Sequence, residues 1–337
     1  MIETQREPLL RTTRLTRHFH LGGIFSRQTL HAVDDVSLSI DEREIVAVVG
    51  ESGSGKSTLA RLLAMAYKPT RGEIYYRGRS VQGLRSRKDL LWYRGQVPMV
   101  FQDPYSSINP VFRVAHGVMR NLILHRPELD ATGRRDEAER VFDVVGLAPS
   151  TEMLRKFPYE MSGGQRQRVG FAQALAVKPK LILADEPVSM LDVSIRAGLL
   201  NLMVELRERE SVSILYITHD IASARYVADR IVVMYAGHIV ETGPADAVLA
   251  SPRHPYTQLL LSAVPDPREV STVSTSAAVG EPPRVVNPGE GCRFRWRCPL
   301  AVAECERSTP LLRPLAPEQQ AACHVARADA GLSGGAA

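Results

Sequence analysis

The chain has 337 residues, of which 44% are hydrophobic and 23% charged, and these values are typical of a globular protein with one large or two ordinary domains. No apolar run approaches the roughly 18 residues of a membrane-spanning helix, and the N-terminal stretch lacks the apolar core of a secretory signal. The formal charge of +5 allows binding to nucleic acid or an anionic membrane, but the basic residues are dispersed. Because no secretory signal is recognised, we expect a protein of the reducing cytosol, where disulfides rarely persist.

Short apolar runs bounded by turn residues predict buried parallel strands, and amphipathic periodicity predicts helices between them. Alternating strands and helices indicate an α/β fold with a parallel-rich sheet. The predicted strands are residues 45–49, 181–185, 212–218 and 230–237, and the predicted helices are residues 56–66, 165–177 and 195–210.

The composition changes along the chain and suggests boundaries between its parts. Residues 1–250 form the expected core domain, and residues of about 104–178 are predicted to be a helical subdomain inserted between core strands. A connector follows that is rich in Pro, Ser, Val and Gly, then a segment with all four cysteines, and last a tail of small residues that we expect to be disordered. The boundaries of these three parts are residues 251–290, 291–325 and 326–337.

The sequence "GESGSGKST" fits the phosphate-loop pattern G-x-x-x-x-G-K-[ST], directly after the strand 45–49 and at the start of the helix 56–66. Glycines allow the tight turn that points backbone N–H groups at phosphate oxygens, and the helix N-terminus adds partial positive charge. We expect Lys56 to reach the β- and γ-phosphates of ATP and Ser57 to ligate Mg²⁺. The predicted nucleotide-binding residues of this loop are Gly50, Glu51, Ser52, Gly53, Ser54, Gly55, Lys56, Ser57 and Thr58.

Two acidic residues end the apolar strand in "LILADEP". Asp185 is expected to hold Mg²⁺ directly or through water. Side chains alternate along a strand, so Glu186 should point elsewhere, and it could accept a proton from an attacking water. The sequence therefore predicts a metal ligand followed by a general base.

The segment "MSGGQ" places a serine and two glycines at the start of the helix 165–177. A hydroxyl and exposed N–H groups at a helix N-terminus form a second phosphate-binding surface. This surface is distant in sequence from the phosphate loop, and the economical geometry is a dimer in which one subunit covers the nucleotide of the other. The residues expected to act on the partner's nucleotide are Ser162, Gly163, Gly164 and Gln165.

With these motifs the chain resembles the ATP-binding cassette (ABC) ATPases, from about residue 10 to residue 250. The resemblance implies an ATPase in which "GESGSGKST" is the Walker A loop and "MSGGQ" the signature, with Met161 in place of the commoner leucine. Asp185 and Glu186 then match the Walker B aspartate and the catalytic glutamate. The other implied roles are Gln102 as the Q-loop glutamine that contacts Mg²⁺ and the transmembrane partner, Asp192 as the D-loop aspartate at the dimer interface, and His219 as the switch histidine at the γ-phosphate.

The same family places an aromatic residue upstream of the first core strand, where it stacks on adenine. Phe19 in "RHFH" is the first choice and Phe25 the second, because an insertion before "HAVDDVSL" blurs the correspondence. Either ring could instead belong to the core.

Four further stretches are similar to the oligopeptide/dipeptide/nickel importer subfamily: "FQDPYSSINP", "DEPVSMLDVSI", "SPRHPYTQLLLSAVP" and "GCRFRWRCPLAVAEC". This resemblance implies a peripheral subunit on the cytoplasmic face of the membrane that hydrolyses ATP to drive import of peptides or a related solute. Its implied partners are a second ATPase subunit, with a paralogue favoured over a second copy, two permease subunits and an extracytoplasmic solute-binding protein. The alternatives are an ABC ATPase linked to nucleic acid, in repair or translation, and a regulatory module that binds ATP without turnover; we expect no nucleic-acid partner.

The four cysteines follow the spacing C-x5-C-x6-C-x17-C and contain no close C-x2-C pair. Four thiolates can hold Zn²⁺ or a 4Fe–4S cluster, or the residues can be small buried hydrophobes. Members of the resembled importer subfamily carry four cysteines here, and some hold a 4Fe–4S cluster, so the resemblance favours a cluster, with Zn²⁺ as the alternative. The implied ligands are Cys292, Cys298, Cys305 and Cys323.

Overall fold

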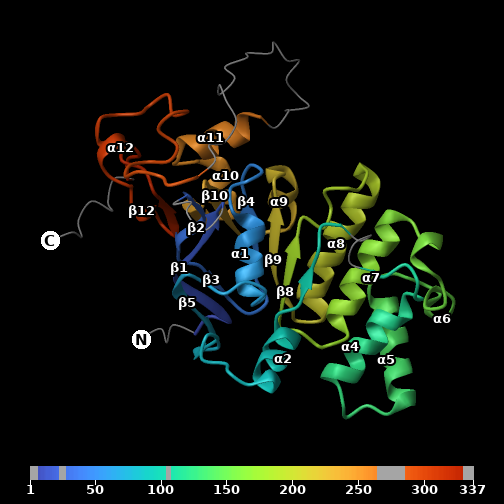
Figure 1. Ribbon diagram of the computed structural model, residues 1–337. Helices are drawn as coiled ribbons and strands as arrows, with labels where there is room; N and C mark the ends of the chain where they lie inside the picture. The colour runs from blue at the N-terminus through green and yellow to red at the C-terminus, as the bar shows by residue number, and fades with distance from the viewer. Residues whose placement is uncertain (1–6, 23–27, 104–107, 264–284, 329–337) are drawn as a thin grey trace, which may run out of the picture.

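The computed structural model describes residues 7–22, 28–103, 108–263 and 285–328. Figure 1 shows a central sheet with helices on both of its faces, a second sheet built from the N-terminal strands, and a group of helices on the side away from the C-terminal part. The α/β fold expected from the sequence is confirmed.

The central sheet has the strand order β12-β13-β11-β10-β4-β9-β8-β7. The pairs β10·β4, β4·β9, β9·β8 and β8·β7 are parallel, whereas β11, β13 and β12 add antiparallel strands at one side. Its strands are β4 (Ile45–Val49), β7 (Met99–Val100), β8 (Leu181–Asp185), β9 (Ser213–Thr218), β10 (Arg230–Tyr235), β11 (His238–Pro244), β12 (Arg313–Ala316) and β13 (Gln319–Ala321).

The apolar run of β4 is buried on both faces. Ile45, Ala47 and Val49 pack into one hydrophobic core, and Val46 and Val48 into the other. A strand covered on both sides needs apolar residues at every position, which is why this run does not alternate. Because β4 lies between β10 and β9, the phosphate loop that follows it starts near the middle of the sheet.

The second sheet is antiparallel, with the order β2-β1-β5-β6 and β3 paired to β1. It covers one face of the central sheet through the core that contains Leu10, Val36 and Ile74. Residues 285–287 extend it, because His31 N donates to Val285 O at 2.9 Å. Its strands are β1 (Leu10–Leu21), β2 (Gln28–Val36), β3 (Ser39–Ile40), β5 (Arg71–Tyr76) and β6 (Arg79–Ser80).

Helices α4 to α7 form the part of the chain expected to be a helical subdomain, and no strand lies among the described residues 108–178. Other helices follow central strands: α1 follows β4, α8 follows β8, α9 follows β9 and α10 follows β11. The helices are α1 (Lys56–Leu63), α2 (Arg87–Gln96), α4 (Ala115–His125), α5 (Ala131–Val144), α6 (Ser150–Met153), η1 (Pro158–Glu160), α7 (Gly163–Leu175), α8 (Val193–Arg209), α9 (Ile221–Val227), α10 (Ala245–Ala250), α11 (Pro255–Ser262) and α12 (Glu304–Arg307).

The cysteine-containing part adds strands β12 and β13 to the edge of the central sheet. β13 pairs with β11, and the buried carboxylate of Glu241 on β11 accepts a hydrogen bond from Gln319 Nε2 at 2.8 Å. The predicted connector 251–290 contains helix α11, and its residues 264–284 lie outside the described residues. Of the tail predicted to be disordered, residues 329–337 also lie outside them.

Candidate nucleotide-binding site

A cavity of about 1000 Å³ opens at the carboxyl ends of the central parallel strands, as expected for a ligand site in an open α/β sheet. Residues from distant parts of the sequence line it: strand β2, the phosphate loop, the ends of β7, β8 and β9, and Val285. The lining residues are Leu30, His31, Ala32, Glu51, Ser52, Gly53, Gly55, Lys56, Ser57, Thr58, Gln102, Glu186, His219 and Val285.

The phosphate loop (residues 50–58) curls around the ammonium group of Lys56. Lys56 Nζ donates to Gly50 O at 2.7 Å and to Glu51 O at 2.9 Å. Burial lowers the pKa of Lys56, and nearby carboxylates oppose this effect. Gly55 has φ +104, and a Cβ atom there would overlap the carbonyl oxygen of Ala32, so only glycine fits.

The two expected Mg²⁺ ligands lie together at the edge of this loop. Ser57 Oγ donates to Asp185 Oδ1 at 2.8 Å, which joins the start of α1 to the end of β8. Burial raises the pKa of Asp185, because the buried carboxylate has lost water. Hydroxyl and carboxylate oxygens are the ligand types that Mg²⁺ prefers, so the residues present fit this ion.

Glu186 lies beside two further cavity residues. Its Oε2 accepts a hydrogen bond from Gln102 Nε2 at 3.4 Å and lies 3.2 Å from His219 Nδ1. The backbone of Glu186 has φ +46, a left-handed conformation that is uncommon for a residue other than glycine. This conformation turns the glutamate into the cavity immediately after the buried Asp185, so the two carboxylates have different environments, as expected from the sequence.

Gln167 on α7 is a functional candidate that sequence reasoning missed. Its Nε2 donates to the carbonyl oxygen of Gln102 at 2.9 Å. The bond connects the helix that begins with the signature segment to the segment that carries Gln102. The pattern "GGQRQR" contains this glutamine, but nothing in a single sequence distinguishes it from a surface residue.

The signature segment (residues 161–165) lies away from the cavity. Ser162 caps α7, with its Oγ accepting from Gln165 N at 3.2 Å, while Gln165 Oε1 accepts from Ser162 N at 3.0 Å. Asp192 likewise caps α8 and accepts from Ile195 N at 3.2 Å. Among the described residues that line the cavity, none comes from the signature segment or from Asp192.

Phe19 is not brought to the cavity. Its ring packs edge-on against Tyr67 at 5.5 Å, and the guanidinium of Arg17 lies 4.5 Å from its centre. Phe25 lies outside the described residues. The cavity wall nearest the β1–β2 hairpin is instead lined by residues that the sequence did not single out, namely Leu30, His31 and Val285.

The four cysteines are all free, with Cys305 and Cys323 buried and the other two half-buried. Burial, with a contribution from the charges of the other three cysteines, raises the pKa of Cys292 to about 11, so the other three thiols lie within electrostatic reach of Cys292. Among the described residues, the group of potential metal ligands within 4.8 Å of one another is His18, His31 and Asp34, and it contains no cysteine.

Comparison with known proteins agrees with the geometry of the cavity. Residues 33–189 match the family model "ABC transporter", and residues 240–305 match "Oligopeptide/dipeptide transporter, C-terminal region". A "Probable peptide ABC transporter ATP-binding protein" of Sinorhizobium fredii is 43% identical over 95% of this chain and 90% of its own length. The "Oligopeptide transport ATP-binding protein OppF" of Salmonella typhimurium is 41% identical over 91% of this chain and 93% of its own length.

The chain belongs to the ABC transporter ATPases, in their oligopeptide/dipeptide branch. It is therefore an ATP-hydrolysing enzyme with ATP and Mg²⁺ as its expected ligands. A solved "Dimeric structure of a post-hydrolysis state of the ATP-binding cassette MJ0796 bound to ADP and Pi" is similar, with a TM-score of 0.62, 28% identity, and coverage of 70% of this chain and 98% of that one. The alternative of an ABC ATPase linked to nucleic acid gains no support from these relatives. Within the described ranges of this ABC ATPase, no helix is long and apolar enough to cross a membrane.

Proposed function

We propose that this chain is the ATP-hydrolysing subunit of a peptide importer and that it works in a dimer with two nucleotides between the subunits. The names of the relatives support the peptide cargo. The main support for the dimer is that the two phosphate-binding surfaces of one chain are separate, since the signature segment does not line the cavity of its own chain. In this arrangement the signature segment of one subunit covers the ATP bound to the phosphate loop of the other.

The residues of the cavity have distinct roles in this proposal. The N–H groups of the phosphate loop and Lys56 would bind the phosphates, and Ser57, Asp185 and Gln102 would hold Mg²⁺, which would neutralise phosphate charge. A proton from the attacking water passes to Glu186. His219 lies close to Glu186, where its ring can orient the carboxylate and contact the γ-phosphate.

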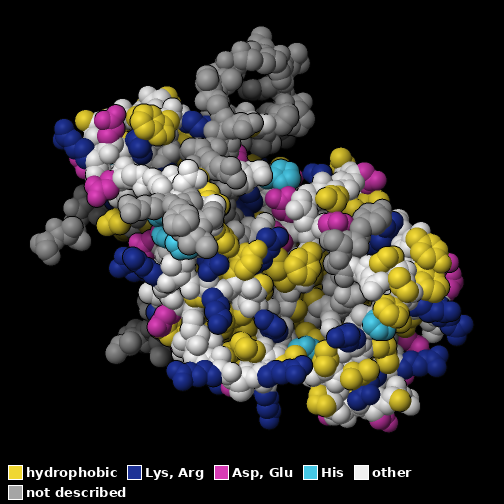
Figure 2. Space-filling model, viewed as in Figure 1, with side chains coloured by type: hydrophobic (Ala, Val, Ile, Leu, Met, Phe, Trp, Pro, Cys, Tyr) yellow, Lys and Arg dark blue, Asp and Glu magenta, His cyan; other side chains and the backbone are white. Residues whose placement is uncertain are grey.

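We further propose that the chain binds the cytoplasmic face of the membrane through two permease subunits. A second ATPase subunit, a paralogue rather than another copy, completes the dimer, and an extracytoplasmic binding protein supplies the solute. Exposed large hydrophobic side chains support a docking surface on the helical part of the chain, where Figure 2 shows hydrophobic groups gathered. They are Val111, Phe112, Ile123, Leu124 and Tyr159.

For the cysteines we propose a 4Fe–4S cluster, with Zn²⁺ as the alternative. Four free cysteines in one short part of the chain, with three thiols within electrostatic reach of Cys292, support this proposal, because four thiolates can hold such a cluster. The group would cross-link the end of the chain. Anaerobic purification followed by a visible spectrum and iron and zinc analysis tests this, and metal-free, folded protein would contradict it.

Transport is tested with proteoliposomes that contain the chain, its partner ATPase and both permeases, with the ATPase side supplied with ATP and the binding protein on the opposite side. We expect uptake of a radiolabelled tripeptide or pentapeptide in the wild type. Glu186→Gln should retain ATP binding but lower hydrolysis and uptake by about 100-fold or more, because the general base is lost. Glu208→Gln, at an exposed glutamate on α8, is the matched control. Hydrolysis by Glu186→Gln at the wild-type rate would refute the catalytic assignment.

A further inference from the structure

The segment between the first two cysteines (residues 292–298, the arginine segment) contacts the phosphate loop directly. Arg297 Nη1 donates to Glu51 Oε2 at 2.7 Å and Arg297 Nη2 to Glu51 Oε1 at 2.9 Å, in a bidentate pair. The Arg297 side chain is 8% exposed and that of Glu51 27%. A fork-to-fork pair of this kind fixes both orientation and charge.

Glu51 is held from a second side by helix α11. Its backbone N–H donates to the hydroxyl of Tyr256 at 2.8 Å. The Tyr256 ring is fully buried and packs against Tyr235, at 4.5 Å between ring centres, and against Phe294 of the arginine segment at 5.5 Å. The start of the phosphate loop therefore rests on residues that follow the predicted ATPase core in the chain.

Arg293 of the same segment forms a second connection. Its Nη1 donates to Ala236 O at 2.5 Å, in the turn between β10 and β11. The next residue in that turn, Gly237, donates its N–H to Ser54 O in the phosphate loop at 2.9 Å. Arg293 also pairs with Asp34 of β2, so both arginines tie the segment to elements that border the nucleotide cavity.

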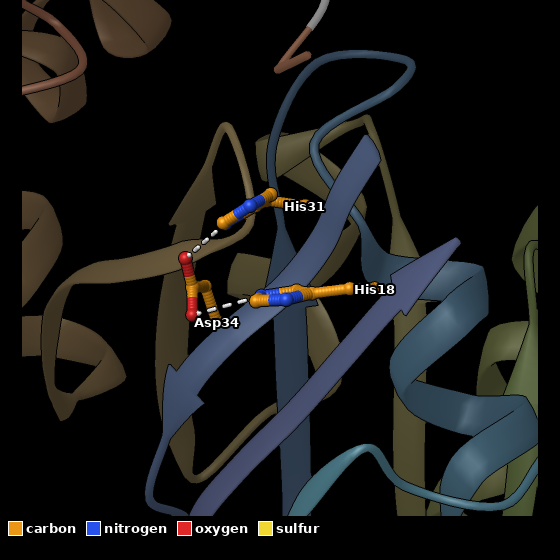
Figure 3. A group of neighbouring side chains, drawn as sticks. All are labelled: His18, His31 and Asp34. Carbon is orange, nitrogen blue, oxygen red and sulfur yellow. Dashed lines mark hydrogen bonds and ion pairs between the residues drawn. The ribbon is translucent and has the colours of Figure 1, made fainter. Parts of the chain in front are cut away.

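Asp34 itself lies in a cluster with the composition of a metal site. His18, His31 and Asp34 bring three potential ligand atoms within 4.8 Å of one another (Figure 3). The carboxylate, however, already binds the guanidinium of Arg293, whose side chain is only 10% exposed. A buried cation at the same carboxylate opposes a second one, so the cluster serves as an anchor for Arg293.

Charge explains why Glu51 needs a partner. Glu51 lines the cavity, and the negative charge of its carboxylate favours the protonated form of Lys56. Because Lys56 is expected to contact the phosphates, Glu51 lies within electrostatic reach of them. An unpaired carboxylate there would repel the triphosphate of ATP. We propose that Arg297 is a positioning residue of the nucleotide site, which neutralises and orients Glu51 and so makes the cysteine-containing extension part of the ATP-binding machinery.

The proposal rests on the proposed ATP site and is tested with the full-length chain by titration with MgATP. We expect Arg297→Gln to weaken ATP binding by about tenfold, equivalent to about 1.4 kcal/mol. At saturating ATP the assembled importer should regain most of its kcat, so that the effect falls on KM. Arg295→Gln is the control, because the hydrogen bond that Arg295 donates goes to Cys292 O in its own segment.

Glu51→Gln distinguishes this role from a purely structural one. Removing the carboxylate leaves the Arg297 cation beside the phosphates, so we expect ATP binding at least as tight as in the wild type. The double variant Glu51→Gln/Arg297→Gln should bind ATP within about twofold of the wild type, because the repulsion that Arg297 offsets is then gone. A merely structural latch would weaken binding in both single variants.

Two outcomes overturn the proposal. One is weaker ATP binding in Glu51→Gln, which is decisive even if Arg297→Gln does not fold. The other is equal binding in Arg297→Gln and Arg295→Gln. If the wild type did not bind MgATP, the proposed function would be wrong. If the wild type binds MgATP but the variants behave as just described, only the role of Arg297 is wrong.

Discussion

Glu186 shows what a single residue's backbone contributes to this site. It follows the last residue of β8 and adopts φ +46, which directs its carboxylate to Gln102 and His219. Strained conformations of this kind concentrate at functional sites. The alternation of strand side chains predicted that Asp185 and Glu186 differ in direction, but it could not predict where Glu186 points, because a left-handed glutamate has no sequence signal.

His254 is a residue whose protonation should control stability. It is buried, and its Nδ1 accepts a hydrogen bond from Tyr256 N at 3.0 Å, which caps helix α11. Burial lowers its pKa from 6.5 to about 4, so the folded state favours the neutral ring. The unfolded chain binds the proton first as pH falls. We therefore expect full stability above about pH 6.5 and a loss between about pH 6.5 and 4 on the order of 3 kcal/mol from this residue.

The measurement is the free energy of unfolding in urea as a function of pH. His254→Asn keeps a short hydrogen-bond acceptor at the cap but has no imidazole to protonate. Between about pH 6.5 and 4, its free energy of unfolding should therefore fall less steeply than that of the wild type, by a slope that corresponds to about one proton. His116→Asn, at an exposed position on α4, is the matched control for the loss of a histidine. Identical slopes in the wild type and His254→Asn would show that His254 is not protonated on unfolding in this range.

At the scale of elements, the central strands were predictable because their apolar runs are uninterrupted. The strands predicted at 45–49 and 181–185 match β4 and β8, and the predicted helix 56–66 is α1, which ends at Leu63. Helix ends are set by local hydrogen bonds rather than by periodicity, so the predicted boundary extends past the observed one.

The second sheet was not predicted from the sequence. β1 has the burial pattern of a half-exposed strand and carries many threonines, arginines and histidines, so no apolar run marks it. Antiparallel strands that are solvated on one face give this weaker signal. Phe19 belongs to this sheet, and its contacts with Tyr67 and Arg17 depend on strand register, which a single sequence does not reveal.

The contact between the arginine segment and the phosphate loop could not be predicted from the sequence either. Glu51 and Arg297 are 246 positions apart in the chain. The alternation of Arg293, Arg295 and Arg297 is visible in "CRFRWRC", but a pattern of this kind does not name a partner. The acidic partners of Arg293 and Arg297 come from β2 and the phosphate loop, and only the tertiary structure brings them together.

At the scale of the whole molecule, each chain of the proposed dimer contributes its phosphate loop to one ATP site and its signature segment to the other. The cavity holds the phosphate loop and Glu186, and the signature segment caps α7 outside the lining of that cavity. The similar cassette of known structure was solved as a dimer with ADP and Pi. Alternation between open and closed dimers can then follow from different nucleotide affinities of the two states.

The most direct test of the shared site is Ser162→Arg, which places a bulky cation in the signature segment. ATP affinity of the isolated subunit should stay within about twofold of the wild type, since this residue does not line its own cavity. In the assembled transporter, hydrolysis should fall by about 100-fold in the site that the substituted segment covers, because phosphate contacts are lost there. Thr151→Arg, at an exposed position on α6, should leave both unchanged. Loss of ATP binding by the isolated Ser162→Arg subunit, or unchanged hydrolysis in the assembly, would contradict the shared site.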